Sequence, residues 1–158
     1  MGEVDMRKTV FMSTCLLLAA TVAGAQGPAP SHAQPEIKWG PAPAIFPPGA
    51  EMAVLQGNPG GTSEFTVRLR MPAGYVIPPH WHPTDENVTV ISGKFRVGMG
   101  KTMSSMLTLH EGGFITAPAN EPHFARTEGV TVVQVHAIGP FAMTYVNPAD
   151  TPRAAAAK

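Results

Sequence analysis

The chain has 158 residues, which is enough for one domain with a modest core and too few for two comfortable ones. Lys plus Arg (11) equals Asp plus Glu (11), so the formal net charge is zero. The charge balance therefore indicates neither a nucleic-acid partner nor a strongly charged protein partner, and we expect a small-molecule ligand.

The first 25 residues have the pattern of a secretory signal peptide. Arg7-Lys8 precedes an uncharged stretch from Thr9 to Ala25, and this stretch ends in Ala23-Gly24-Ala25, a small-x-small cleavage sequence. We predict cleavage after Ala25 and a periplasmic or secreted protein. Translation from Met6 would remove Glu3 and Asp5 and leave Met6-Arg7-Lys8 as the positively charged segment that begins a signal peptide.

The alternative for this stretch is an uncleaved membrane anchor. It is disfavoured because the stretch is shorter than the ~20 residues that a membrane span needs, so we expect no stable membrane anchor after processing. The only cysteine, Cys15, would be removed with the leader. Disulfides and thiolate metal sites are then excluded from the mature protein, and only His and carboxylate side chains remain for transition-metal binding.

Three further regions follow the leader. Residues 26–36 form a Pro/Ala-rich linker without apolar periodicity, and residues 151–158 form a similar flexible tail. We expect residues 37–150 to fold as one domain, with its core at about 64–146.

The domain has the pattern of many short strands. Phe65, Val67 and Leu69 alternate with polar residues, which is typical of a half-buried strand. Other expected strands are Glu86–Val90, Phe95–Met99, Met106–Leu109, Phe114–Ala117, Val130–Ile138 and Phe141–Val146, with Ser92-Gly93-Lys94 as the turn between the first two. With 17 prolines and 16 glycines and no long helical pattern after the leader, an all-β sandwich or barrel is predicted.

Residues 79–86, PHWHPTDE, gather potential metal ligands on this scaffold. His80 and His82 lie at i and i+2, so an extended segment presents both on one face. After a short turn, Glu86 begins the next strand, and His123 follows a turn farther along the chain. The alternative is that these are unrelated turn residues.

The spacing of these residues favours a shared site. Gly74, His80, His82, Glu86 and Gly93 reproduce the first motif of the cupin superfamily, G(X)5HXH(X)3-4E(X)6G. The chain therefore resembles a small, single-domain, metal-binding cupin of the conserved-barrel type over roughly residues 64–145. The resemblance implies a jelly-roll β-barrel.

The second cupin motif, G(X)5PXG(X)2H(X)3N, is matched at Gly112, Pro118 and His123. Asn120 stands where the family usually has Gly. Among the residues other than Gly, Asn best tolerates a positive φ, so we expect the turn to form. Thr127 replaces the closing Asn, and we expect the site to tolerate this change.

The resemblance implies that His80, His82, Glu86 and His123 bind one divalent transition metal ion. The ion could be Fe, Mn, Ni, Cu or Zn, because three imidazoles and a carboxylate suit all of them. Glu86 is also the candidate catalytic residue, since it could leave the metal or accept a proton. Candidate pocket walls are the apolar residues Val88, Val90, Met99, Phe114 and Ala125.

Other side chains near these motifs have simpler interpretations. We expect Trp81 to point away from the metal, and His110 to lie on a surface loop. His136 and Gln134 share one face of a strand, which either lines the cavity or faces solvent; we favour solvent, because the opposite face is more apolar.

Two functions fit these observations. One is a metal-dependent oxidoreductase, dioxygenase-like, acting on a small organic substrate. The other is a non-catalytic periplasmic protein that binds a metal or a small ligand. We expect a homodimer in either case, with Ile37–Trp39 and Ala53–Leu55 as candidate interface strands; a monomeric mass in light scattering would contradict this.

Overall fold

The computed structural model describes residues 37–152. The predicted leader (1–25) and linker (26–36) lie outside these residues, as does most of the predicted tail (151–158). Within the described part, no helix is long and apolar enough to cross a membrane.

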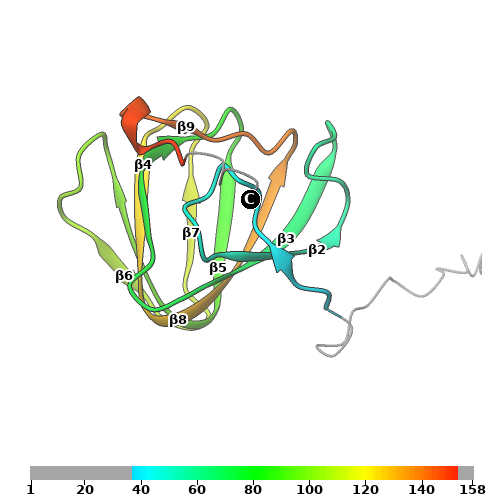
Figure 1. Cartoon of the computed structure of the whole chain (residues 1–158), viewed down its shortest axis with the longest axis horizontal. Coiled ribbons are helices and arrows are strands. Elements are labelled where there is room, and N and C mark those ends of the chain that lie inside the picture. Colours follow the sequence, from blue (N-terminus) through cyan, green and yellow to red (C-terminus); the bar gives the residue numbers. More distant parts are fainter. Residues whose placement is uncertain (1–36, 153–158) are drawn as a thin grey trace, which may run out of the picture. The chain divides into compact units, whose positions relative to one another are not determined.

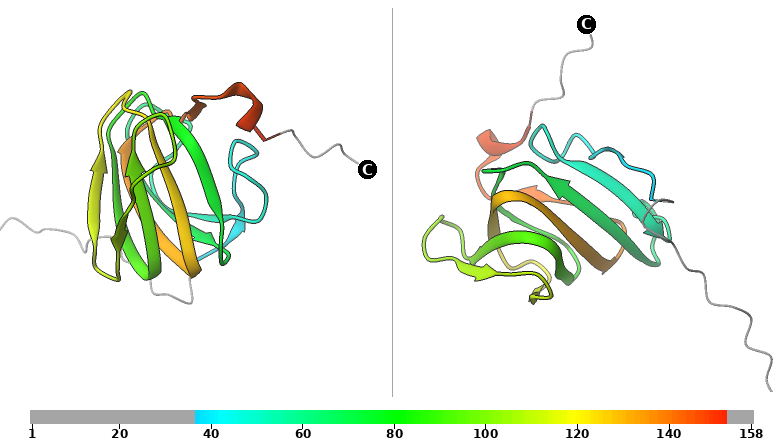
Figure 2. Two further views of the ribbon diagram at one scale, coloured as in Figure 1. Left: turned by 90° about the vertical axis from the view of Figure 1, so that its left-hand side faces the viewer. Right: turned by 90° about the horizontal axis from the view of Figure 1, so that it is seen from below.

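Strands account for nearly all of the regular structure. They are β1 (Gly40–Pro41), β2 (Glu51–Gln56), β3 (Glu64–Met71), β4 (Val76–Trp81), β5 (Glu86–Met99), β6 (Leu107–Leu109), β7 (Phe114–Ala117), β8 (His123–Ile138) and β9 (Thr144–Tyr145), with the 3-10 helix η2 (Pro148–Asp150) near the end. All strand pairs are antiparallel, in the order β1-β2-β3-β8-β4-β9, and β5 pairs with β6, β7 and β8. The sheet curls around a common interior (Figures 1 and 2), so the predicted all-β jelly-roll barrel is confirmed.

The predicted turn at Ser92-Gly93-Lys94 is wrong, because β5 is one continuous strand of 14 residues. The buried positions change phase here, from even numbers up to Val90 to odd numbers from Phe95. The register with β8 shifts twice in this stretch, and Gly93 has a φ of +84°. A bulge therefore absorbs one residue within the strand and keeps the apolar side chains on the inner face.

Strand β8 is the longest element and holds the barrel together. One of its edges pairs with β5, and the other pairs with β3 and β4. The predicted strand Val130–Ile138 is only its C-terminal half, whereas the predicted strand Phe141–Val146 is reduced to β9. The N-terminal half of β8 begins at His123, which places this histidine beside β4.

The barrel interior is filled by apolar side chains from nearly every strand. The buried core cluster consists of Phe46, Ala50, Phe65, Val67, Leu69, Met71, Tyr75, Ile77, Val88, Val90, Phe95, Val97, Leu109, Ala125, Val133, Val135, Ala137, Met143 and Tyr145. Because this core does not depend on the histidines, burial of apolar surface can hold the barrel together without a metal.

Thr127, on β8, holds the turn before β4 in place. Its Oγ1 donates a hydrogen bond to the Pro72 carbonyl (2.6 Å) and accepts one from the Tyr75 N–H (2.9 Å). The side chain is buried. Thr127→Val keeps the shape but leaves both partners without this bond, so we expect a loss of about 1–3 kcal/mol in the free energy of unfolding, measured by urea denaturation.

Thr116→Val is the matched control for this prediction. The Thr116 hydroxyl also donates a hydrogen bond, to Asn87 Oδ1 at 2.8 Å, but on the exposed surface. Its removal should change the free energy of unfolding by no more than about 0.5 kcal/mol. Equal effects of the two substitutions would show that Thr127 does not fasten the turn.

Candidate metal centre

Three histidines from β4 and β8 converge inside the barrel. His80 lies directly opposite His123 in the β4/β8 pairing, and the centroids of the two rings are 4.3 Å apart. His82 follows β4 by one residue, and its ring centroid is 5.2 Å from that of His123. One ring nitrogen from each histidine lies within 4.8 Å of the others, and all three side chains are buried. The predicted convergence of these three residues is therefore observed.

The backbone fixes the orientation of each ring. Nδ1 of His80 donates to the Pro78 carbonyl (2.7 Å), Nδ1 of His82 to the Ala142 carbonyl (2.7 Å) and Nδ1 of His123 to the Glu121 carbonyl (3.1 Å). In the neutral form of each imidazole the ring proton is therefore on Nδ1, and Nε2 keeps its lone pair. This is the arrangement in which histidines bind a metal.

Two of these Nε2 atoms have no hydrogen-bond partner within the described residues, although they are buried. They belong to His82 and His123. Leaving a buried polar atom unsatisfied costs about 1–3 kcal/mol, and such atoms are uncommon in native structures. A divalent transition metal would satisfy both lone pairs, so the residues present fit the ion that the cupin motif implies.

Two turns bring the ligands of the two sequence motifs together. The turn at Pro118–Asn120 bonds to the turn before β5 through Asn120 N–H to the His82 carbonyl (2.7 Å) and Ala119 N–H to Asp85 Oδ1 (2.8 Å). Asn120 adopts a φ of +62°, as its replacement of Gly predicted. These two hydrogen bonds between the turns bring His123 close to His80 and His82 of the first motif.

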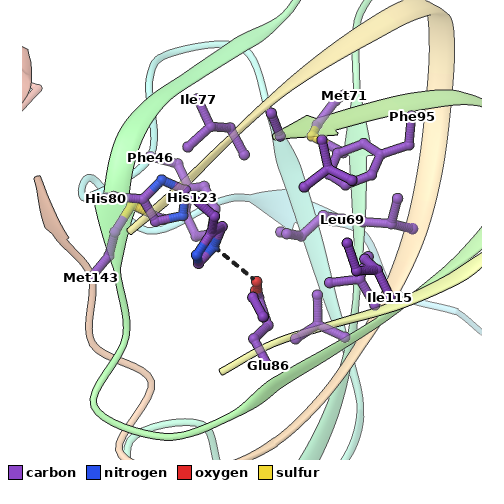
Figure 3. Close-up of a pocket in the computed structure, with 16 residues that line it drawn as sticks. Phe46, Leu69, Met71, Ile77, His80, Glu86, Phe95, Ile115, His123 and Met143 are labelled. Atoms are coloured by element: carbon purple, nitrogen blue, oxygen red, sulfur yellow. Dashed lines mark ion pairs between the residues drawn. The ribbon is translucent and has the colours of Figure 1, made fainter. Parts of the chain in front are cut away.

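Glu86 points into the same space from the start of β5 (Figure 3). Its Oε2 is 3.4 Å from Nε2 of His123 and 3.6 Å from Nε2 of His82. Burial raises the pKa of Glu86, but the contact with His123 and the attraction of the three imidazoles in their protonated state oppose this and bring the pKa to about 2. The carboxyl group is therefore an anion at neutral pH.

His80 is the most strongly perturbed base of the cluster. Burial, followed by the nearby rings of His123 and His82, lowers the pKa of His80 to about 3. The ring is therefore neutral at physiological pH, which is the state that a metal ligand requires.

A narrow apolar cavity adjoins the three histidines. His80, Glu86 and His123 lie in its wall, and the other lining residues are apolar: Phe46, Leu69, Met71, Ile77, Val88, Phe95, Val97, Ile115, Ala117, Ala125, Val133, Val135 and Met143. Figure 3 shows several of these side chains facing the ligand cluster. The cavity volume is about 30 Å³, which leaves room for only a few atoms beside the ligands.

The predicted pocket walls are correct in part. Val88 and Ala125 line the cavity. Val90 is buried in the core but does not line it, whereas Met99 and Phe114 are 43% and 58% exposed, so their prediction is wrong. The spacing of Met99 after Phe95 and Val97 predicts an inward side chain, but Met99 is the last residue of β5 and the inward alternation does not extend to it.

The predictions for the remaining polar residues agree with the structure. His136 is exposed and Gln134 half-buried, on the outer face of β8, where they bond to Thr66 and Arg68. His110 is exposed and Trp81 is half-buried. None of them joins the ligand cluster.

Sequence reasoning missed three residues that surround the ligands. Phe141 stacks on His82 with ring centroids 5.2 Å apart and an interplanar angle of 17°. Met143 and Phe46 lie in the cavity wall, and both come from segments outside the regular barrel strands. The alternation of Phe141 and Met143 with Ala142 and Thr144 predicts a strand, but it does not show that these side chains reach the histidines, and the surroundings of Phe46, rich in Pro and Ala, carry no periodicity.

The comparisons with known proteins agree with this geometry. Residues 67–139 match the family model of the cupin domain. Among curated proteins, no significant match is found. The family match covers the three histidines, most of β3 and the strands β4 to β8, but not the segment that contains Phe46.

Several solved structures share the fold. The polyketide cyclase RemF from Streptomyces resistomycificus is 16% identical, with a TM-score of 0.67 over 78% of this chain and 89% of that one. A putative acetylacetone dioxygenase from Methylibium petroleiphilum is 23% identical, with a TM-score of 0.60 over 82% and 89%. An oxalate oxidase is 19% identical, with a TM-score of 0.51 over 66% and 59%. At these identities the similarity establishes the fold alone.

Proposed function

Since this chain belongs to the cupin superfamily through the domain at residues 67–139, we propose that it is a metal-dependent oxidoreductase, dioxygenase-like, acting on a small organic substrate. The observation that carries the proposal is the set of three buried imidazoles with inward lone pairs beside an ionised carboxylate and an apolar cavity. Solved structures with this fold include a putative acetylacetone dioxygenase and an oxalate oxidase, which supports the reaction class by analogy.

The three histidines would hold the metal, with Glu86 as the fourth ligand. Two metal–ligand bonds of ~2.1 Å at right angles place their ligand atoms about 3 Å apart. The Oε2 atom of Glu86 is 3.4 Å from Nε2 of His123 and 3.6 Å from Nε2 of His82. A small movement of the carboxylate would therefore complete the set. The bound ion would supply Lewis acidity and, if it is Fe, Mn or Cu, redox chemistry.

The chain's own residues would bind, orient and deprotonate the substrate. The apolar cavity excludes water and favours an uncharged portion of the ligand, while its small volume selects a compact molecule. Glu86 is an anion that reaches the three histidines, so its Oε2 is the group placed to accept a proton from a bound enol. We also propose export and a periplasmic site of action, based on the leader pattern of residues 1–25; N-terminal sequencing of the purified protein tests this.

Elemental analysis of the natively purified protein, followed by oxygen uptake with small aliphatic enol substrates, tests the proposal. We expect close to one Fe, Mn, Ni or Cu per chain and oxygen consumption that depends on it. Glu86→Gln keeps the shape of the side chain but removes the base, so turnover should fall about 10²- to 10⁴-fold. Glu111→Gln, at an exposed carboxylate, is the matched control.

A different outcome would favour the alternative, a non-catalytic metal or small-ligand binding protein. In that case, the metal would be present but no substrate would stimulate oxygen uptake. Glu86→Gln would then change metal retention and nothing else. The absence of bound metal after purification without chelators, together with failure to take up added metal, would contradict the metal-dependent enzyme and a metal-binding protein alike, and would leave only binding of a small ligand.

A further inference from the structure

A proline-rich segment outside the matched cupin domain closes one side of the cavity. This strap, residues 41–50, has Pro at positions 41, 43, 47 and 48 and carries Phe46 near its centre. The Phe46 side chain is 4% exposed, although the residues on either side of it are only partly buried. Phe46 is therefore the one large side chain of the strap that is fully buried, while Ile45 packs against the core from a partly buried position.

Hydrogen bonds hold the strap on both sides of Phe46. The Tyr145 hydroxyl donates to the Ile45 carbonyl (2.8 Å), and the Tyr75 hydroxyl donates to the Pro47 carbonyl. The ends of the strap are joined by Ala42 N–H to the Ala50 carbonyl (3.0 Å). Since each proline also fixes one φ angle, the backbone that carries Phe46 has few alternative conformations.

The Phe46 ring contacts the surroundings of the metal ligands. It stacks with Phe141 at a centroid distance of 5.9 Å, and Phe141 in turn stacks on His82. Phe46 also lines the same cavity as His80 and Glu86, and Figure 3 shows it behind the His80 ring. The ring is thus part of the ligand pocket as well as part of the core.

The strap also lines a second hollow. It has a volume of about 300 Å³ and is formed by strap residues and Pro152. Phe46 is the residue shared by the linings of the inner cavity and of this hollow, which is about ten times larger.

We propose that Phe46 is a specificity-determining residue, whose ring sets the upper size of the molecule that the cavity accepts. With the ring in place, the cavity takes compact ligands of a few heavy atoms. Without it, the cavity extends toward the strap hollow and takes ligands with an aromatic ring. This inference rests on the proposed function in one respect, since it treats the cavity as the ligand site.

Binding of benzene to the metal-free protein tests this role of Phe46 directly. An apolar cavity opened by removal of a large side chain takes up benzene, so Phe46→Ala should bind benzene at least about tenfold more tightly than the wild type in an NMR titration. Phe114→Ala is the matched control, because Phe114 is exposed on β7. The smaller change Phe46→Leu should give an intermediate gain and covers the case in which Phe46→Ala does not fold.

Equal benzene affinity in the wild type and in both Phe46 variants would overturn the inference, as would an equal gain in Phe114→Ala. The metal-loaded protein gives a second readout. With Co²⁺ bound, the wild type should take acetohydroxamate in preference to benzohydroxamate, and Phe46→Ala should reverse this preference. If the wild type binds no Co²⁺, the proposed function fails, while the benzene comparison still decides the role of Phe46.

Discussion

His82→Ala is expected to lower the affinity for a divalent transition metal by about 100-fold or more, while the barrel remains folded. Loss of an outer hydrogen bond to a metal-binding histidine already costs 10- to 100-fold, and this substitution removes the ligand itself. The barrel should survive because the core cluster is apolar and does not include the histidines. Competition titration of Co²⁺ or Zn²⁺ against a chromophoric chelator measures the affinity, and circular dichroism reports the fold.

His110→Ala provides the control for this prediction. His110 is exposed and outside the ligand cluster, so its removal should leave metal affinity unchanged. Unchanged affinity in His82→Ala would remove this residue from the ligand set. Unfolding of His82→Ala under conditions where the metal-free wild type stays folded would mean that His82 itself holds the barrel together, through its bond to Ala142 or its stacking on Phe141.

The ligand cluster could be predicted from sequence because its geometry is local to two short motifs. The i and i+2 spacing places His80 and His82 on one side, and the motif glycines Gly74, Gly93 and Gly112 all have positive φ, at +71°, +84° and +80°. Each of these conformations favours glycine strongly, so the spacing of glycines records where the backbone turns or bulges. The bonds that orient the rings could not be predicted, since their acceptors are backbone carbonyls.

The wrong turn at Ser92-Gly93-Lys94 has a physical explanation. A polar, glycine-containing tripeptide between two apolar runs is typical of a hairpin, but the same residues also suit a bulge. The pairing partner decides between the two: β5 and β8 are both long enough to remain paired on both sides of Gly93. Pairing between residues that are distant in sequence is not contained in the local pattern.

The wall of the cavity was the least predictable part of the site. Phe46 comes from a segment whose prolines indicate a loop, and nothing in its spacing shows which side chain turns inward. Phe141 belongs to the predicted strand Phe141–Val146, but the strand pattern does not show that its ring stacks on His82. Their positions depend on hydrogen bonds and ring contacts made across the barrel, such as Tyr145 to Ile45. Substrate selection therefore depends on contacts that sequence patterns do not reveal.

The metal-free protein is expected to lose stability as the pH falls from 6.5 toward 3. In the unfolded chain the His80 imidazole takes up a proton below its ordinary pKa of 6.5, whereas burial lowers its pKa to about 3 in the folded state. The unfolded state therefore binds more protons throughout this window, so the free energy of unfolding falls with falling pH, by up to about 1.4 kcal/mol per pH unit. Below pH 4.5 Glu86 acts in the same direction, because its folded pKa of about 2 is lower than its ordinary value.

His80→Gln separates the two contributions. This substitution removes the imidazole, so the slope of stability against pH between 6.5 and 4.5 should become smaller, while the fall below pH 4.5 should remain. His110→Gln, at an exposed site, should leave the whole profile unchanged. Urea denaturation of the metal-free proteins at a series of pH values gives the profiles. If the slopes of the wild type and His80→Gln coincide above pH 4.5, His80 takes up its proton in the folded barrel and is not held neutral by burial.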